Sequence, residues 1–212
     1  MSADDWLADT RTSYDATAAS YADVVRDILG GRQPYLSAAL GLFANQVLAA
    51  GGGPVADVGC GPGHVTAHLH GLGVDAFGID LSPGMIEVAR SDHPGLRFEV
   101  GSMTDLDLPA ASVSGLIAWW SLIHISDDAM PAVLGHFHRV LRPGGPLQVG
   151  FHVGERSQAK AEGRGDPITV HGHRRRPERV ADWLRDAGFT VESQWEFNMG
   201  TDRPGAVLFA RR

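Results

Sequence analysis

The spacing of hydrophobic positions divides the chain into a helical beginning and an alternating remainder. Apolar side chains recur near helical spacing over residues 16–29 until Gly30-Gly31 breaks the pattern, and a second helix is expected at 34–49. The run Gly51-Gly52-Gly53-Pro54 then stops any helix. Residues 1–50 are therefore expected to form a helical cap that precedes the main domain.

From residue 55 onward, short apolar runs alternate with helical patterns. The expected strands are 55–58, 74–80, 96–100, 113–119, 147–152, 189–197 and 206–210. The expected helices between them are 64–71, one that Ser82 caps and Pro83 begins, 127–141 and 177–187. Such alternation indicates right-handed βαβ units, so we expect a doubly wound α/β fold with a mostly parallel sheet and helices on both faces.

The segment 154–176 follows neither period and is rich in Gly, Arg and His. It lies between a strand and the last helix. We expect it to run over the carboxyl ends of the strands, partly extended at 167–173, as a substrate-side excursion of a domain that covers residues 51–212.

One segment carries the main chemical signal. The strand Val55-Ala56-Asp57-Val58 leads directly into Gly59-Cys60-Gly61-Pro62-Gly63, and a helix follows. Its three glycines let the backbone turn sharply and approach a ligand with no Cβ in the way. Ligands of open α/β sheets bind outside the carboxyl ends of the strands, so this turn is expected to line a binding site.

An acidic residue at the end of the next strand extends this signal. Asp80 closes the run 74–80 and precedes Leu81-Ser82. A carboxylate in that place can accept hydrogen bonds from both hydroxyls of a ribose. The glycine turn and Asp80 together indicate a ligand that contains a nucleoside.

The glycine spacing separates two classes of nucleoside ligand. A nicotinamide site usually carries G-x-G-x-x-G, whereas here the third glycine is Gly63 and the spacing is G-x-G-x-G. Asp57 also lies two residues before the first glycine. Its carboxylate would repel a pyrophosphate but tolerate a cationic sulfonium. An NAD-dependent oxidoreductase is therefore the less favoured alternative.

Composition limits the remaining function classes. The net charge of −7 disfavours binding to nucleic acid, which usually requires a basic surplus. The sequence contains no run of roughly 18 apolar residues that a membrane span needs, and its beginning lacks the apolar stretch of a signal peptide. The single cysteine, Cys60, excludes an internal disulfide. A cytoplasmic protein without a membrane partner is expected.

The segment Asp57-Val58-Gly59-Cys60-Gly61-Pro62-Gly63 resembles motif I of the class I S-adenosylmethionine (SAM)-dependent methyltransferases. The resemblance continues in Gly78-Ile79-Asp80-Leu81-Ser82-Pro83-Gly84-Met85, in Val100-Gly101-Ser102-Met103, over 116–125 and in Leu141-Arg142-Pro143-Gly144-Gly145. It is close over residues 50–152. It implies a Rossmann-like sheet of seven strands, SAM as methyl donor, S-adenosylhomocysteine as product, and no metal.

The resemblance also implies roles for individual residues. The glycines would bracket the methionine end of SAM, Asp80 would hold the ribose, and Ser102 would flank the adenine where many relatives carry an acid. Tyr14-Asp15-x-x-Ala18-x-x-Tyr21 resembles the N-terminal helix that closes over SAM in members that act on small molecules. The implied cofactor residues are Tyr14, Tyr21, Asp57, Gly59, Cys60, Gly61, Gly63, Asp80, Leu81, Met85, Ser102, Met103 and Trp119.

Candidate residues for the acceptor are histidines. His124 lies where relatives carry a residue that lines the acceptor pocket, so it is a candidate general base, with an orienting or structural role as the alternative. His152 and His171 are the next candidates. His171-x-His173 offers only two ligands on one strand face, so no metal site is expected. The run Arg174-Arg175-Arg176 is either a solvated cluster or a site for a substrate anion.

These patterns predict methyl transfer to an O, N or C atom of a small-molecule acceptor, a bacterial metabolite in kind, by a monomer or homodimer. The alternative within the same family is a SAM-binding protein without catalysis.

Overall fold

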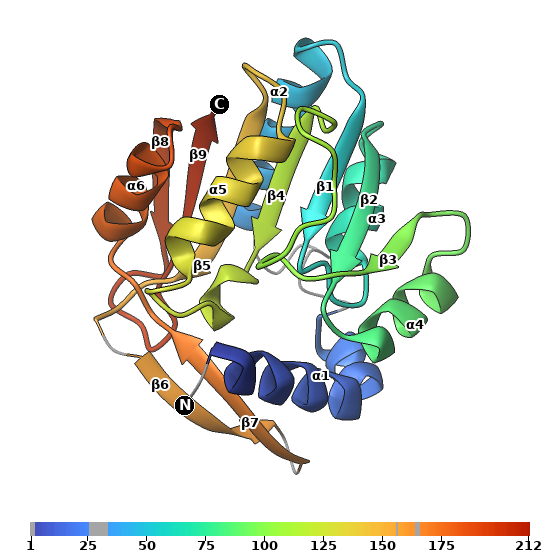
Figure 1. Ribbon diagram of the computed structural model, residues 1–212, viewed down its shortest axis with the longest axis vertical. Helices are drawn as coiled ribbons and strands as arrows, with labels where there is room; N and C mark the ends of the chain where they lie inside the picture. Colours follow the sequence, from blue (N-terminus) through green and yellow to red (C-terminus); the bar gives the residue numbers. More distant parts are fainter. Residues whose placement is uncertain (1–2, 26–33, 156, 164–165) are drawn as a thin grey trace.

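The computed structural model describes residues 3–25, 34–155, 157–163 and 166–212, without the side chains of residues 3–5 and 157–171. At its centre, seven strands form one sheet in the order β3-β2-β1-β4-β5-β9-β8 (Figure 1). The strands are β1 (Pro54–Val58), β2 (Asp75–Asp80), β3 (Phe98–Val100), β4 (Gly115–Trp119), β5 (Pro146–His152), β8 (Thr190–Phe197) and β9 (Gly205–Arg211).

Strands β1 to β5 pair in parallel, and β9 is antiparallel to both of its neighbours, β5 and β8. The expected doubly wound, Rossmann-like sheet of seven strands is confirmed. The order reverses at β1, where the chain passes from β3 back to β4. In open α/β sheets this reversal is the place where ligands bind.

Helices cover both faces of the sheet. Helices α2 (Pro34–Ala49) and α3 (His64–Gly71) pack with Val55, Ile117 and Phe209 on one face. Helices α5 (Met130–Val140) and α6 (Pro177–Asp186) pack with Leu116 and other strand residues on the opposite face. Helix α4 (Pro83–Asp92) packs against β3 and Cys60. The buried apolar strands predicted from the sequence thus lie between two helical layers.

Two elements cross the carboxyl ends of the parallel strands. Helix α1 (Ala3–Val25) lies along this edge, in contact with α4 and with β7 (Asp166–His173) (Figure 1). Strand β7 forms a separate antiparallel hairpin with β6 (Ser157–Gly163). The segment expected to be partly extended at 167–173 is therefore a two-stranded ribbon beside α1.

Three details differ from the sequence-based expectation. The helix expected at 127–141 begins at Met130, because Ser126 first forms a turn in which its carbonyl accepts from the N–H groups of Ala129 and Met130. A short 3-10 helix, η1 (Leu122–His124), precedes that turn. Strand β6 was not predicted, because its sequence SQAKAEG contains no β-branched, aromatic or large apolar residue. The predicted break at Gly30-Gly31 lies outside the described residues.

No described helix is long enough and apolar enough to cross a bilayer.

The packing of α2 on the sheet predicts a clear difference between two of its residues. Phe43 is fully buried, whereas Leu48 is 44% exposed. Phe43→Ala leaves a cavity and should lower the free energy of unfolding by about 3–5 kcal/mol. Leu48→Ala should cost about 0.5 kcal/mol or less, as exposed positions do. Urea denaturation measures both, and equal losses would contradict this placement of α2.

Candidate active site

The glycine turn after β1 is fixed to the end of β2 by backbone and side-chain hydrogen bonds. The N–H groups of Gly59 and Cys60 donate to the carbonyl of Ile79 at 2.7 and 3.1 Å. The N–H of Gly61 donates to Asp80 Oδ2 at 2.7 Å, and that of Ser82 donates to Asp80 Oδ1 at 2.9 Å. The turn and the carboxylate therefore form one rigid unit.

The three glycines of the turn have different surroundings. All have left-handed φ angles, 78° at Gly59, 54° at Gly61 and 81° at Gly63. A Cβ on Gly59 would lie 2.2 Å from Ser121 Cβ, and one on Gly63 would lie 2.7 Å from the Phe98 ring. A Cβ on Gly61 would meet nothing nearer than Tyr21 Cε1 at 3.9 Å. Gly61 alone of the three faces open space.

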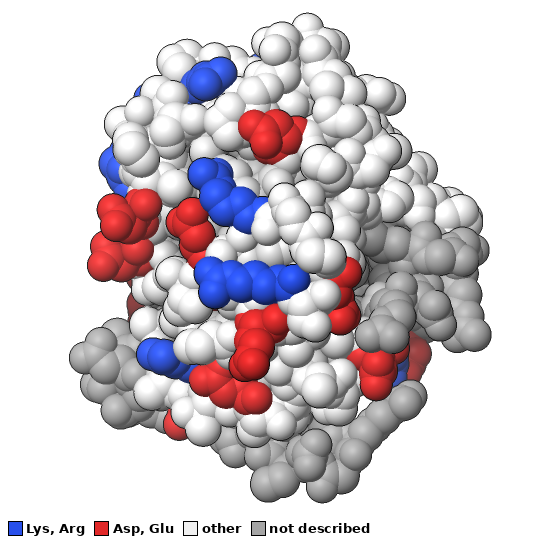
Figure 2. Space-filling model, turned by 90° about the vertical axis from the view of Figure 1, so that its right-hand side faces the viewer, with Lys and Arg blue, Asp and Glu red and all other residues white. Residues whose placement is uncertain are grey.

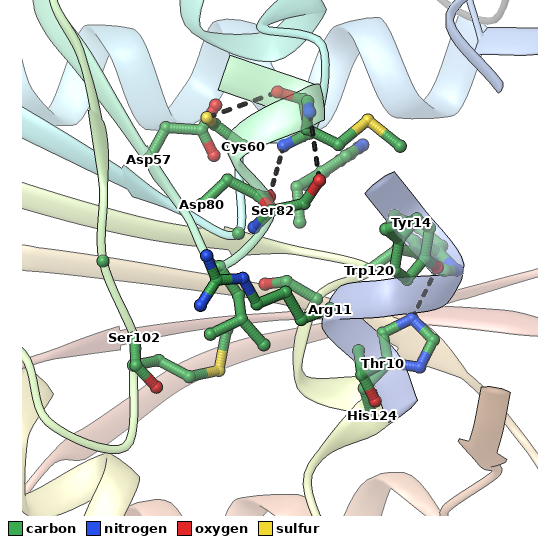
Figure 3. Close-up of a pocket in the computed structure, with 18 of the residues that line it drawn as sticks. Thr10, Arg11, Tyr14, Asp57, Cys60, Asp80, Ser82, Ser102, Trp120 and His124 are labelled. Carbon is green, nitrogen blue, oxygen red and sulfur yellow. Dashed lines mark hydrogen bonds between the residues drawn. The ribbon is translucent and has the colours of Figure 1, made fainter. Parts of the chain in front are cut away.

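That open space is a cavity between the turn and α1 (Figure 3). It contains almost every residue proposed for the cofactor, brought together from α1, the glycine turn and the ends of β2, β3 and β4. Those residues are Tyr14, Tyr21, Asp57, Gly59, Cys60, Gly61, Asp80, Leu81, Met85, Ser102, Met103 and Trp119. The residues that the sequence motifs associate with the cofactor therefore lie around one cavity.

Gly63, His152 and His171 are exceptions. Gly63 does not line the cavity, since it begins α3 and packs beneath Phe98. His152 lies behind the wall, where its Nδ1 accepts from Trp120 Nε1 at 3.3 Å. The side chain of His171 lies outside the described residues, and its backbone belongs to β7. Gly63 and His152 therefore do not line this cavity, and their contacts with a ligand stay predictions.

Sequence reasoning missed residues from three places that also line the cavity. Helix α1 adds Trp6, Leu7, Thr10 and Arg11, the glycine turn and the start of α3 add Pro62, His64 and Val65, and the segments that follow β2, β3 and β4 add Ser82, Gly101, Trp120, Ser121 and Ile125. The α1 residues precede Tyr14 by three, four, seven and eight positions, so the helical face of Tyr14 and Tyr21 predicts them when it is extended toward the N-terminus.

Two polar atoms in the cavity wall are buried without a partner among the described residues. Asp57 is fully buried; its Oδ2 accepts from Thr66 Oγ1 at 2.7 Å, while its Oδ1 accepts nothing. His64 Nδ1 is likewise unpaired. An unpaired buried polar atom is costly, so a ligand that offered either atom a hydrogen bond would be favoured here.

Burial shifts the titration of these groups. It raises the pKa of Asp57 to about 7, against the opposing effect of the Thr66 hydrogen bond. It lowers the pKa of His64 to about 4, with His93 and His68 contributing in the same direction. Burial also raises the pKa of Asp80, although the N–H groups of Ser82 and Gly61 oppose it. The cavity therefore holds a neutral imidazole and two carboxylates that a cation would stabilise.

Cys60 is not a nucleophile in this arrangement. Its side chain is buried against Ile86, Ala89 and Phe98. Burial raises the pKa of its thiol well above the ordinary value, with Asp80 and Asp57 adding to the effect. The thiol is thus protonated at neutral pH, and the residue is a small apolar part of the turn.

Another part of the cavity wall joins α1 to η1. Tyr14 Oη and His124 Nε2 share a hydrogen bond of 2.7 Å, and Tyr21 packs edge-to-face on Tyr14 with ring centroids 5.6 Å apart (Figure 3). Burial raises the pKa of the Tyr14 phenol well above its ordinary value, so it remains protonated. Around this pair the wall is mainly aromatic and aliphatic, from Trp6, Leu7 and Trp120.

In the arginine run that follows β7, Arg176 has a side chain that is 65% exposed, whereas Arg175 is buried. Arg175 is 5% exposed and lies under η1, where it donates to the carbonyls of Leu122, at 3.0 Å, and Ile125. It also pairs with Asp127 Oδ1 at 3.0 Å. With its donors used in this way, Arg175 supports the loop that carries His124. It does not face the cavity and cannot hold a substrate anion.

Comparisons with known proteins agree with this geometry. Residues 55–145 match the methyltransferase domain family. Malonyl-[acyl-carrier protein] O-methyltransferase of Serratia marcescens is 31% identical over 135 residues, which are 64% of this chain and 46% of that protein. Phosphoethanolamine N-methyltransferase 3 of Arabidopsis thaliana is 34% identical over 46% of this chain and 21% of its own length. The chain spans less than half the length of these curated relatives.

Among solved structures, 1,6-didemethyltoxoflavin-N1-methyltransferase of Burkholderia thailandensis, with S-adenosylhomocysteine bound, superimposes with a TM-score of 0.75. At 21% identity it covers 100% of this chain and 91% of its own, so it shows a shared fold from end to end. The family match, the ordered motifs and this fold agree with one another. The chain therefore contains a segment, residues 55–145, that is similar to the methyltransferase domain family, within a fold shared with SAM-dependent methyltransferases.

Proposed function

We propose that this protein binds SAM in the cavity between the glycine turn and α1 and transfers its methyl group to a small-molecule acceptor. The observation that carries the proposal is the pair of carboxylates beside the turn, Asp57 with an unpaired oxygen and Asp80 at the end of β2. SAM presents an ammonium group, a sulfonium and a ribose diol. Both cationic centres complement the negative wall of this cavity.

Each part of SAM has a suitable partner in the wall. Asp57 Oδ1 would accept from the ammonium group of SAM, and neutral His64, with its proton on Nδ1, would donate to the carboxylate of the same methionine moiety. The carboxylate oxygens of Asp80 each accept one backbone N–H and retain a further lone pair for the ribose hydroxyls. Leu81, Met85 and Met103 give the adenine an apolar surface. Ser102 Oγ and Thr104 Oγ1 share a hydrogen bond of 2.7 Å, so Ser102 stabilises the loop that follows β3.

The acceptor belongs at the end formed by Trp6, Leu7, Trp120 and the Tyr14–His124 pair. Among the described lining residues Arg11 is the one arginine or lysine, and its side chain is 53% exposed. Such a wall favours a neutral acceptor with an aromatic or aliphatic body over an anionic one. The Burkholderia enzyme, which was solved with 1,6-didemethyltoxoflavin bound, supports an acceptor of this kind.

A small acceptor also agrees with the charge on the surface. The net charge is −7, and the face drawn in Figure 2 shows basic side chains scattered among acidic ones. Binding to nucleic acid depends largely on neutralising phosphates with a basic surface. We therefore propose no nucleic acid partner.

Bound SAM supplies a carbon that is already activated by the sulfonium, so the protein has to align it with a nucleophilic O, N or C atom. The sulfonium of SAM would serve as the leaving group, taking the electron pair of the broken S–C bond. The acceptor proton goes to a base or to water. His124 Nε2 is bonded to Tyr14, so we propose that His124 orients the Tyr14 hydroxyl toward the acceptor, in preference to general-base catalysis.

The direct test is release of S-adenosylhomocysteine from SAM over a panel of small aromatic and aliphatic acceptors, with tRNA and total protein as separate arms. Turnover with a small molecule supports the proposal. Methylation of RNA or protein alone would contradict the substrate class. SAM binding without turnover on any arm would favour the non-catalytic alternative.

Gly61→Ala distinguishes an effect on ligand binding from an effect on folding. The new methyl group clashes with no side chain, so the variant should fold with a loss of about 1–2 kcal/mol from its left-handed φ. Its affinity for S-adenosylhomocysteine should fall more than about tenfold, because the methyl group occupies ligand space. Gly95→Ala, at φ 98° with open space around it, is the matched control for strain and should bind normally. Calorimetric titration measures both, and normal binding by Gly61→Ala would remove the ligand from this turn.

Asp57 makes affinity depend on pH. With a pKa of about 7, it is mostly protonated at pH 6 and ionised at pH 8. Only the carboxylate attracts an ammonium group, so affinity for S-adenosylhomocysteine should rise by up to about tenfold per pH unit below pH 7 and level off above it. Asp57→Asn should bind weakly at every pH. A wild-type affinity that is flat from pH 5.5 to 8 would contradict the contact.

The same pKa predicts the opposite trend for stability without ligand. The folded state holds the Asp57 proton more tightly than the unfolded state does, so the free energy of unfolding falls as pH rises from about 4 to 7 and is constant above. Asp57→Asn should remove this contribution, as denaturation at a series of pH values would show.

His124→Gln and His124→Leu distinguish the two roles of the histidine. Gln can still accept from Tyr14, so an orienting role predicts near-normal kcat in Gln and a loss in Leu. A general-base role predicts losses of about 100-fold or more in both, since neither side chain can take the proton. The measurement is kcat with the acceptor found in the panel.

A further inference from the structure

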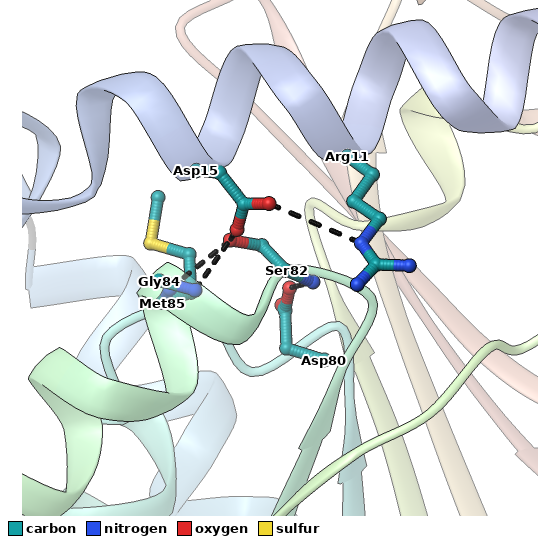
Figure 4. A network of polar contacts seen from close by, with 6 residues as sticks. All are labelled: Arg11, Asp15, Asp80, Ser82, Gly84 and Met85. Atoms are coloured by element: carbon teal, nitrogen blue, oxygen red, sulfur yellow. Dashed lines mark hydrogen bonds and ion pairs between the residues drawn. The ribbon is translucent and has the colours of Figure 1, made fainter.

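Asp15 connects α1 to the start of α4 (Figure 4). Its Oδ1 accepts from Ser82 Oγ at 2.6 Å and from the N–H of Gly84 at 2.9 Å. Its Oδ2 lies 3.9 Å from Arg11 Nε, one helical turn away. Asp15 itself does not line the cavity, so none of these contacts is a ligand contact.

The bonds of Asp15 continue to the ribose carboxylate. The N–H of Ser82 donates to Asp80 Oδ1 at 2.9 Å, and Ser82 Oγ accepts from the N–H of Met85 at 3.0 Å. Ser82 is therefore bonded at once to α1, to Asp80 and to the first turn of α4. A displacement of Asp15 would free the Ser82 hydroxyl and change the setting of Asp80.

The two helices are closely packed at this point. A Cβ on Gly84 would lie 3.2 Å from the Cα, the carbonyl oxygen and Oδ1 of Asp15. The absence of a side chain at Gly84 thus lets the backbone of α1 reach the first turn of α4. The carboxylate also lies at the end of α4 where the helix dipole favours a negative charge.

We propose that Asp15 is a positioning residue for the nucleoside half of the cofactor site. It fixes Ser82, and through Ser82 the carboxylate of Asp80, so that docking of α1 sets the affinity for the ribose. This inference rests on the proposed SAM site. Asp15 itself touches no part of the ligand. Its contacts couple the docking of α1 on α4 to the affinity for the ligand.

The coupling acts in both directions. A ligand that needs Asp80 in this setting stabilises α1 against α4, and α1 in this position lowers the dissociation rate of the ligand. The Asp15 side chain is 37% exposed, so solvent screens its interactions. The coupling free energy between α1 docking and ligand binding should therefore be small. We expect about a tenfold effect on affinity.

The test is binding of S-adenosylhomocysteine, measured by calorimetry and by stopped-flow dissociation. Asp15→Ala should bind about tenfold more weakly, mainly through faster dissociation, while Asp9→Ala, an exposed acid of the same helix, should match the wild type. Equal affinities of wild type and Asp15→Ala would overturn this inference alone. Absence of binding by the wild type would overturn the proposed function as well.

A second variant tests the same contact without removing a charge. Gly84→Ala should favour α4 by helix propensity, yet its Cβ must push Asp15 and the backbone of α1 away from the first turn of α4. We expect weaker binding of S-adenosylhomocysteine, with no loss of melting temperature. Gly135→Ala in α5, where a Cβ meets nothing within 4 Å, is the matched control. Unchanged affinity in Gly84→Ala would contradict the role of close packing here.

A double-mutant cycle distinguishes positioning from general packing of α1. If Asp15 acts through Asp80, the double variant Asp15→Ala/Asp80→Ala should bind no more weakly than Asp80→Ala alone. Additive losses would show that Asp15 acts on affinity by another route and would overturn the proposal. Hydrogen exchange over residues 10–25 with bound S-adenosylhomocysteine should be faster in Asp15→Ala than in the wild type.

Discussion

The site depends on the hydrogen bond between the N–H of Gly61 and the carboxylate of Asp80, 2.7 Å long. Parallel strands bring their carboxyl ends to one edge, and the pairing of Val58 with Ile79 places the glycine turn directly beside the end of β2. Because Gly61 has a left-handed φ, its N–H can point at that carboxylate. Turn and acid thus fix each other before any ligand arrives.

This arrangement concentrates negative charge where water is scarce. Asp57 is fully buried with one oxygen unpaired, and burial raises the pKa of both Asp57 and Asp80. The protein holds these carboxylates at a cost in stability, and a cationic ligand removes part of that cost. The same electrostatics explain why a sulfonium amino acid suits this cavity better than a pyrophosphate.

Much of the architecture could be predicted from the sequence, because strand and helix periods are local. The helix at 64–71 and the cap by Ser82 before Pro83 are found where expected. The glycine turn and Asp80 meet because parallel topology brings them together. Strand β6 could not be predicted, since its polar residues form a strand only by pairing with β7. The burial of Arg175 depends on carbonyls of η1 that lie far away in sequence.

The sequence motifs also could not predict the individual roles of their residues. The three glycines look equivalent in sequence, but Ser121 and Phe98 occupy the space where a Cβ would lie on Gly59 and Gly63, and that space is open only at Gly61. The sequence could not distinguish a general-base role of His124 from an orienting role. The bond that distinguishes them joins His124 to Tyr14, 110 positions away, and is therefore a tertiary contact. Asp15 gave no separate signal, because its partners at Ser82 and Gly84 are set by the docking of α1.

Calorimetric titration of the wild-type protein with SAM and, separately, with NADH tests the central claim most directly. The two ligands share the ribose that Asp80 suits, but only SAM brings cationic groups to Asp57. We expect saturable binding of SAM at one site per chain and no binding of NADH at the same concentrations. Binding of NADH with equal or greater affinity, or no binding of SAM, would contradict it.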